Sequence, residues 1–238
     1  MIRILHLYHD LMNLYGDYAN VSALKRILEK KGEEVKVEKL SLSDSASIGD
    51  CDFIFVGSGT ERNMRVALGD LKKYSRSLKS YIESGKPALF TGNSFEMLGK
   101  TITDCRGETV EGLGFFDFTV TEQNKTRLTA DVICACSFLT QPLVGFVNKC
   151  SGISGVSSPL FTVEMGLGNS EGDKYEGVRL NNFFGTHLTG PALIKNPHFL
   201  AYFAELILGK TPETDYLTNE RAGYDVTLGE LRKRVEAK

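Results

Sequence analysis

The sequence predicts an α/β protein of three layers, with a parallel β-sheet at its core, helices on both faces and an antiparallel extension. Apolar stretches typical of buried strands alternate with amphipathic helical stretches over about the first ninety residues. Such alternation requires a parallel sheet that is covered on both faces. A second observation is the short apolar strand 88–90, which turns sharply into a helix that starts near Phe95.

Four strands of the parallel core are expected at 2–8, 35–37, 53–56 and 88–90. Between them, apolar residues recur at helical spacing in 21–28 and in 71–82. Gly32 and Gly85 follow these two helices, where a left-handed residue can end a helix. Because ligands bind beyond the carboxyl ends of parallel strands, we expect a site where the third and fourth strands end.

The pattern changes after Gly114. Short strands separated by Gly, Asn and Ser are expected at 115–120, 132–136, 143–147, 160–163 and 178–184. Asn196 is a candidate cap for a helix that begins at Pro197 and runs to Leu208. We therefore predict one domain over residues 1–209, followed by a tail at 210–238. The tail's short helix would begin at the capping box 227–230.

Composition excludes several classes of function. The chain has 238 residues, 42% of them hydrophobic, and a net charge of −2 without a basic patch, which argues against binding to nucleic acid or to an anionic membrane. No stretch approaches the roughly 20 apolar residues of a membrane span, and the N-terminus shows no signal peptide, so we expect a cytoplasmic protein. Of the five cysteines, only Cys134 and Cys136 are close in sequence, and no second pair completes a metal site. Neither a metal nor a cofactor is expected.

The segment 87–99 has the geometry of a nucleophile elbow, in which a turn holds one side chain above the strand ends and aims the N–H groups of a helix at the ligand. Its sequence, Pro-Ala-Leu-Phe-Thr-Gly-Asn-Ser-Phe-Glu-Met-Leu-Gly, closely resembles the elbow of the cobyric acid synthase-like class I glutamine amidotransferases. The match needs no gap. It puts Gly92 where that family has its cysteine nucleophile.

Further motifs support the resemblance, which within that family is strongest to the glutaminase subunits of lipid II isoglutaminyl synthases. They are Asn13-Leu-Tyr-Gly-Asp17, Gly57-Ser-Gly59, Arg127-Leu-Thr-Ala-Asp131, Gly145-Phe-Val-Asn148 and Gly185-Thr-His-Leu-Thr-Gly-Pro191. The last resembles the motif that carries the family's catalytic histidine. Here Thr189 stands at the histidine position, and His187 stands where the family has tyrosine.

The resemblance implies a glutaminase fold without its catalytic pair. Hydrolysis of the glutamine amide needs a thiolate, a histidine to move the proton and N–H groups to hold the oxyanion. Gly92 cannot attack, Thr189 cannot replace the base, and none of the cysteines lies on the elbow. We therefore expect no catalytic residues of the family type.

A ligand pocket could nevertheless remain. The resemblance assigns the binding of the glutamine carboxylate to Arg127, whose planar fork suits a carboxylate. The other residues expected to line the pocket are Gly57, Ser58, Gly59, Asn93 and Glu96. A small amino acid or carboxylate is the expected ligand, although Glu96, which replaces a glutamine of the family, would repel a carboxylate and attract an amine.

Three hypotheses of function follow. The first is a non-catalytic binding, scaffold or regulatory subunit; the resemblance implies a Mur-ligase-like synthetase as partner and a link to the amidation of a peptidoglycan precursor. The second is a hydrolase or transferase with a rebuilt dyad of Ser94 and His187. The alternative interpretation of these two residues is that Ser94 only caps the elbow helix and His187 only lines the pocket. The third is an active subunit that supplies ammonia to such a synthetase.

Overall fold

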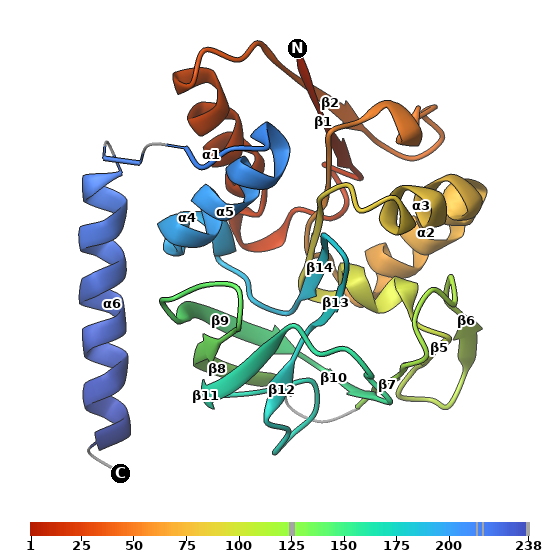
Figure 1. Cartoon of the computed structure of the whole chain (residues 1–238). Helices are drawn as coiled ribbons and strands as arrows, with labels where there is room; N and C mark the ends of the chain where they lie inside the picture. The colour runs from red at the N-terminus through yellow and green to blue at the C-terminus, as the bar shows by residue number, and fades with distance from the viewer. Residues whose placement is uncertain (124–126, 213, 216, 237–238) are drawn as a thin grey trace.

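The computed structural model describes residues 1–123, 127–212, 214–215 and 217–236 (Figure 1). Its central sheet has six strands in the order β13-β14-β4-β3-β1-β2. They are β1 (Ile2–Leu7), β2 (Val35–Leu40), β3 (Phe53–Val56), β4 (Ala88–Thr91), β13 (Val178–Leu180) and β14 (Phe183–Thr186). Every pair is parallel except the edge pair β13–β14. The parallel core that the strand–helix alternation predicted is confirmed.

Helices cover both faces of this sheet, which makes three layers (Figure 1). Side chains of β3 alternate between two buried clusters, as the period of a strand requires. Ile54 and Val56 pack with α2 (Glu61–Leu71) and α3 (Ser75–Glu83). Phe53 and Phe55 pack with α1 (Tyr18–Lys30) and α5 (Pro197–Leu208) on the opposite face, where α4 (Ala192–Lys195) also lies.

Two four-stranded sheets form the extension. The first has the order β10-β7-β5-β6, with β5 (Thr101–Thr103), β6 (Thr109–Glu111), β7 (Thr119–Glu122) and β10 (Ser151–Ser154). The second has the order β12-β11-β8-β9, with β8 (Leu128–Ala135), β9 (Leu143–Lys149), β11 (Phe161–Met165) and β12 (Tyr175–Glu176). All their pairings are antiparallel except β5–β7, which is parallel.

Several local expectations need correction. The helix expected at 71–82 starts earlier, at Glu61, and a 3₁₀ turn over Lys72–Tyr74 divides it into α2 and α3. Asn196 precedes α5 but does not cap it, because its side chain pairs with the backbone N–H and C=O of Val144 in β9 instead. Gly32 and Gly85 end their helices with φ of +83° and +80°, as expected.

The tail forms a longer helix than the capping box predicted, because α6 spans Thr218–Glu236. Thr227 lies inside this helix, where its hydroxyl donates to the carbonyl of Gly223. Tyr224 and Leu231 pack α6 against Ile133 of β8 and Val144 of β9. Among the described residues, no helix combines the length and the apolar character that crossing a membrane requires.

We expect Leu231→Ala to lower the free energy of unfolding by about 2 kcal/mol, because it removes a buried side chain that holds α6 on the domain. Leu231 is 4% exposed, whereas Val226 on the same helix is 68% exposed. Val226→Ala is therefore the control, with an expected change below about 0.5 kcal/mol. Urea unfolding of both variants measures the difference, and equal effects would show that α6 does not depend on this contact.

Candidate functional site

The elbow lies where the sequence placed it. β4 ends at Thr91, and Gly92 opens a 3₁₀ helix, Gly92–Leu98, rather than a regular α-helix. Gly92 has a φ of +61°, which lies in the left-handed region that glycine adopts without strain from a Cβ atom. The backbone therefore keeps the elbow conformation although the side chain that an elbow normally presents is missing.

The space beside Gly92 is already occupied. A Cβ atom added to Gly92 would overlap Cβ and Oγ of Ser58 and would lie 3.2 Å from its Cα. Ser58 is buried in the loop that follows β3. The glycines on either side of it leave no room for a Cβ atom, because Gly57 lies against Met12 and Asp17 and Gly59 lies against Met12. The serine thus stands where the first side-chain atom of a nucleophile would have to be.

Two backbone donors of the loop beside the elbow are bound within the protein. The N–H of Ser58 donates to Oδ2 of Asp17 at 2.6 Å, and the same oxygen accepts the hydroxyl of Thr91 at 2.9 Å. The N–H of Gly59 donates to Oδ1 of Asn93 at 3.0 Å. These two loop donors, which could help to hold an oxyanion, are therefore paired with side chains of the chain itself.

Arg127 is also held by neighbouring protein groups. Its Nε donates to Oδ1 of Asn148 at 2.6 Å, one terminal nitrogen donates to Oε1 of Glu61 at 2.6 Å, and the other donates to the carbonyl of Asn148 at 3.1 Å. Its side chain is 41% exposed and lies beside Glu61, the first residue of α2. All three nitrogens of its fork thus contact acceptors of the protein.

Cys150 lies in the pocket but not on the elbow. Its thiol donates to Oε1 of Glu61 at 3.2 Å. Burial, together with the hydrogen bond to Glu61 and its charge, raises the pKa of this thiol to about 12, although Arg127 lowers it. Because the thiolate is the nucleophilic form, Cys150 is chemically unlike an activated cysteine.

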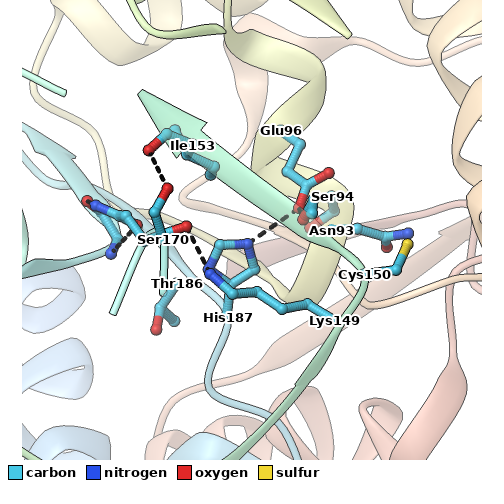
Figure 2. Close-up of polar contacts among 12 residues, drawn as sticks. Asn93, Ser94, Glu96, Lys149, Cys150, Ile153, Ser170, Thr186 and His187 are labelled. Carbon is cyan, nitrogen blue, oxygen red and sulfur yellow. Dashed lines mark hydrogen bonds and ion pairs between the residues drawn. The ribbon is translucent and has the colours of Figure 1, made fainter. Parts of the chain in front are cut away.

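The two residues of the hypothetical dyad have other partners. Ser94 is buried, and its hydroxyl lies 2.7 Å from the carbonyl of Thr91 and 3.0 Å from that of Val56. These contacts fix the elbow turn to the end of β3. Ser94 does not cap the elbow helix, because it lies inside that helix and its hydroxyl donates to carbonyls instead of accepting from N–H groups. His187 places Nε2 at 3.0 Å from Oε1 of Glu96 (Figure 2). Its Nδ1 lies 3.2 Å from Oε1 of Glu176.

A buried polar network surrounds His187. Glu176 accepts the hydroxyl of Thr186 at 2.7 Å and the N–H of His187 at 2.6 Å. Oε1 of Glu96 also accepts the hydroxyl of Ser151 at 2.5 Å. Glu176 was not predicted, because the short strand β12 that carries it shows no recognisable motif. The network connects the elbow helix to β10, β12 and the end of β14.

Lys149 and Thr189 are held by the backbone. Nζ of Lys149 donates to the carbonyls of Gly168 and Asn169, each at 2.6 Å, and burial lowers the pKa of its ammonium to about 8 although nearby carboxylates raise it. The N–H and the hydroxyl of Thr189 both donate to the carbonyl of Phe146 at 2.9 Å. Thr189 therefore joins its loop to β9.

The predicted ligand residues do come together. They line a small cavity at the carboxyl ends of β3 and β4. Its walls are Ser58, Gly59, Glu61, Asn93, Glu96, Glu122, Arg127, Asn148, Lys149, Cys150 and Ser151. The space that remains has a volume of about 10 Å³, which is about the room of one water molecule. Of the predicted set, only Gly57 is outside the lining.

A three-layer fold with a strand-to-helix elbow and a glycine loop at neighbouring strand ends defines a glutamine amidotransferase-like protein. Comparison with known proteins agrees: the CobB/CobQ-like glutamine amidotransferase domain matches residues 3–197, so the chain belongs to this family.

Two curated relatives are similar over most of the chain, and both are named lipid II isoglutaminyl synthase (glutamine-hydrolyzing) subunit GatD. The protein from Staphylococcus aureus (strain N315) is 34% identical over 204 residues, which cover 86% of this chain and 83% of the relative. The protein from Streptococcus pneumoniae (strain ATCC BAA-255 / R6) is 32% identical over 203 residues, covering 84% and 78%.

Solved structures agree on the fold. A crystal structure of a glutamine amidotransferase aligns with a TM-score of 0.54 and 16% identity, covering 85% of this chain and 98% of that one. The glutaminase domain of Trypanosoma brucei CTPS with bound acivicin aligns with the same TM-score and 11% identity, covering 88% and 95%.

The contact between Ser58 and Gly92 predicts a non-additive pair of substitutions. Gly92→Cys puts a Cβ atom at a positive φ, which costs about 1–2 kcal/mol, and forces it into Ser58, which adds about 1–3 kcal/mol. Ser58→Gly removes the second cost. The double variant should therefore be more stable than the sum of the two single changes predicts, and a double-mutant cycle by chemical denaturation measures this coupling. Additivity would mean that Ser58 does not occupy this space.

Asp17 predicts a pH dependence. Burial raises the pKa of its carboxyl to about 6 from 3.8, although the bonds from Ser58 and Thr91 lower it. The folded chain therefore holds this proton up to a higher pH than the unfolded chain, and the contribution of Asp17 to stability falls as pH rises from about 4 to about 6. Relative to Asp17→Asn, the wild type should lose about 2 kcal/mol across that window. Unfolding curves at pH 4, 5, 6 and 7 test this, and a constant difference between the two proteins would contradict it.

Proposed function

We propose that this chain is a non-catalytic glutamine amidotransferase-like subunit that binds or regulates a synthetase partner. The observation that carries the proposal is the pair of Gly92 and Ser58. The elbow has no nucleophile, and the neighbouring loop fills the position from which one would act.

The other catalytic requirements support the same proposal. The base position is Thr189, whose hydroxyl is bound to a backbone carbonyl. The donors of Ser58 and Gly59 are paired with Asp17 and Asn93. Triads that lose a member retain only about 10³–10⁴-fold acceleration over water. The cavity is far smaller than a glutamine side chain.

The names of the relatives suggest the process. Both are subunits of lipid II isoglutaminyl synthase, so a role in the amidation of a peptidoglycan precursor, beside a Mur-ligase-like synthetase, is the process we propose. A subunit that keeps the fold but not the chemistry would contribute a surface to that assembly, and the synthetase would obtain its ammonia elsewhere. We also propose a cytoplasmic location for this assembly.

The decisive experiment measures glutamate release from glutamine by the purified chain, alone and co-expressed with a Mur-ligase-like synthetase. We expect no release above background in either case, because a partner can order loops but cannot supply a thiol at Gly92. Turnover by the unmodified chain would overturn the proposal. Its loss in Ser94→Ala would then favour the rebuilt dyad, and its loss in Cys150→Ala would assign the thiol in the pocket.

A reconstruction series provides the control. Gly92→Cys and Thr189→His restore the family's residues at the nucleophile and base positions. Ser58→Gly is added as a third change because Ser58 overlaps the space that a Cβ atom at Gly92 needs. We expect the single and double variants to remain inactive and the triple variant to be the first that could release glutamate. Activity in the Gly92→Cys, Thr189→His double variant that equals the triple would show that Ser58 is no obstacle.

A further inference from the structure

The helix α6 presents a face that the rest of the described chain leaves uncovered. It lies beyond residues 3–197, which the family model matches. Figure 1 shows it along one side of the molecule, with the other labelled elements on its inner side. Tyr224 and Leu231 are its buried residues, whereas Val226 is 68% exposed. At about 100° per residue, Val226 faces away from this buried pair.

Four exposed charged residues form one strip along α6. They are Arg221, Asp225, Arg232 and Glu236. The helical repeat places them within about 60° of one another, on one flank between the buried residues and the outermost ones. Along the helix their signs alternate, starting with a positive charge, at intervals of four, seven and four residues. The pattern is therefore symmetric about a midpoint between residues 228 and 229.

The folding of one copy makes little use of this strip. The ion pairs that join α6 to the domain come from other residues of the helix and are Glu220–Arg26 and Arg234–Asp131. Within the described residues, the side chains of Asp225, Arg232 and Glu236 have neither a hydrogen bond nor an ion pair. Arg221 bonds the hydroxyl of Thr214. The strip thus presents an ordered set of charges to solvent.

The strip is complementary to itself when it is reversed. In two antiparallel helices related by a two-fold axis, the same flank of each helix meets, and each residue lies opposite the one equally far beyond the midpoint. Asp225 then lies opposite Arg232 of the second copy, and Arg221 lies opposite Glu236 of the second copy. The axis repeats both contacts, so all of them are attractive. Charges that flank a helix contact in this way set the direction in which two helices pair.

A glycine lies at the same midpoint and faces outward. Gly229 is exposed in the interior of α6, where glycine destabilises a helix relative to alanine. A Cβ atom added there would meet nothing within 4 Å, so packing inside one copy does not require this glycine. Without a side chain, it allows a second backbone to approach closely at the axis. Ala222 and Val226 extend the same outer face, so the small residues and the charged strip share one centre.

We propose that α6 pairs with α6 of a second copy of this chain, antiparallel and centred near Gly229. The charged strip sets the direction and the register of the pair, and Ala222 and Val226 supply its apolar contact. A contact between single helices is smaller than the roughly 1,200–2,000 Å² of a stable interface, so the pair is weak and depends on concentration. It uses a helix that carries none of the residues at the elbow, and so it does not depend on the proposed function.

Sedimentation equilibrium of the full chain between about 10 µM and about 1 mM measures the pairing. Asp225→Arg brings like charges together twice in the dimer, so we expect the dissociation constant to rise about tenfold. Arg232→Asp should weaken the pair to the same extent. Combining the two changes exchanges the signs and should restore the wild-type value. Residues 225 and 232 of one copy are about 10 Å apart along the helix, so the combination cannot repair a contact inside the monomer.

Glu111→Arg is the matched control, because it makes the same change of charge as Asp225→Arg on the exposed strand β6, on the other side of the molecule from α6 (Figure 1). It should leave the dissociation constant unchanged, and circular dichroism checks that each variant keeps its helix content. A chain that stays monomeric up to about 1 mM would overturn the proposal and leave this face to a different protein. Single variants that do not weaken the pair, or a combined variant that does not restore it, would overturn the antiparallel register.

Discussion

The carboxylate of Asp17 joins three segments that the chain brings together from distant positions. Its Oδ2 accepts from the Ser58 N–H after β3 and from the Thr91 hydroxyl at the end of β4, while Asp17 itself immediately precedes α1. Hydrogen bonds to a charged acceptor are stronger than neutral ones, and burial increases the cost of losing them. The relative positions of the glycine loop and the elbow, and so the shape of the cavity, depend on this one group.

The contacts of His187 hold the elbow helix on its other side. His187 stands between Glu96 and Glu176, and its ring packs edge-on against Phe95 with centroids 4.6 Å apart. The elbow helix is therefore fixed to the central sheet through Asp17 and Ser94 and to the extension through Glu96. Such a buried network is costly unless every member is satisfied, and among the described residues Oδ1 of Asp17 and Nδ1 of His187 are buried without a hydrogen-bond partner.

Much of this could be predicted from the sequence, for physical reasons that differ between elements. The parallel strands were recognisable because strands buried on both faces read as continuous apolar runs, as Phe53–Val56 does. The elbow was recognisable because glycine and a strand–helix boundary coincide at Gly92. The start of α6 was not, since Thr227 offered a local capping pattern that the contacts of Tyr224 with the domain override.

The sequence predicted which residues line the cavity, but not the contacts that those residues make. Arg127, Asn93 and the glycine loop do line one cavity, yet no sequence pattern indicated that Glu61 and Asn148 would hold Arg127. Glu122 and Cys150 were missed because they come from β7 and the turn between β9 and β10, and only the tertiary fold places them beside the elbow. Pairing between distant side chains is the information that a local pattern does not contain.

The overlap between Ser58 and Gly92 also bears on the history that such a chain can have. A single substitution that restores cysteine meets an occupied space, and one that clears the space gains no function by itself. Each single step toward a cysteine at this position is therefore disfavoured or without benefit. If the chain is non-catalytic, as we propose, the packing of Ser58 against Gly92 obstructs the mutational path by which a cysteine nucleophile could arise there.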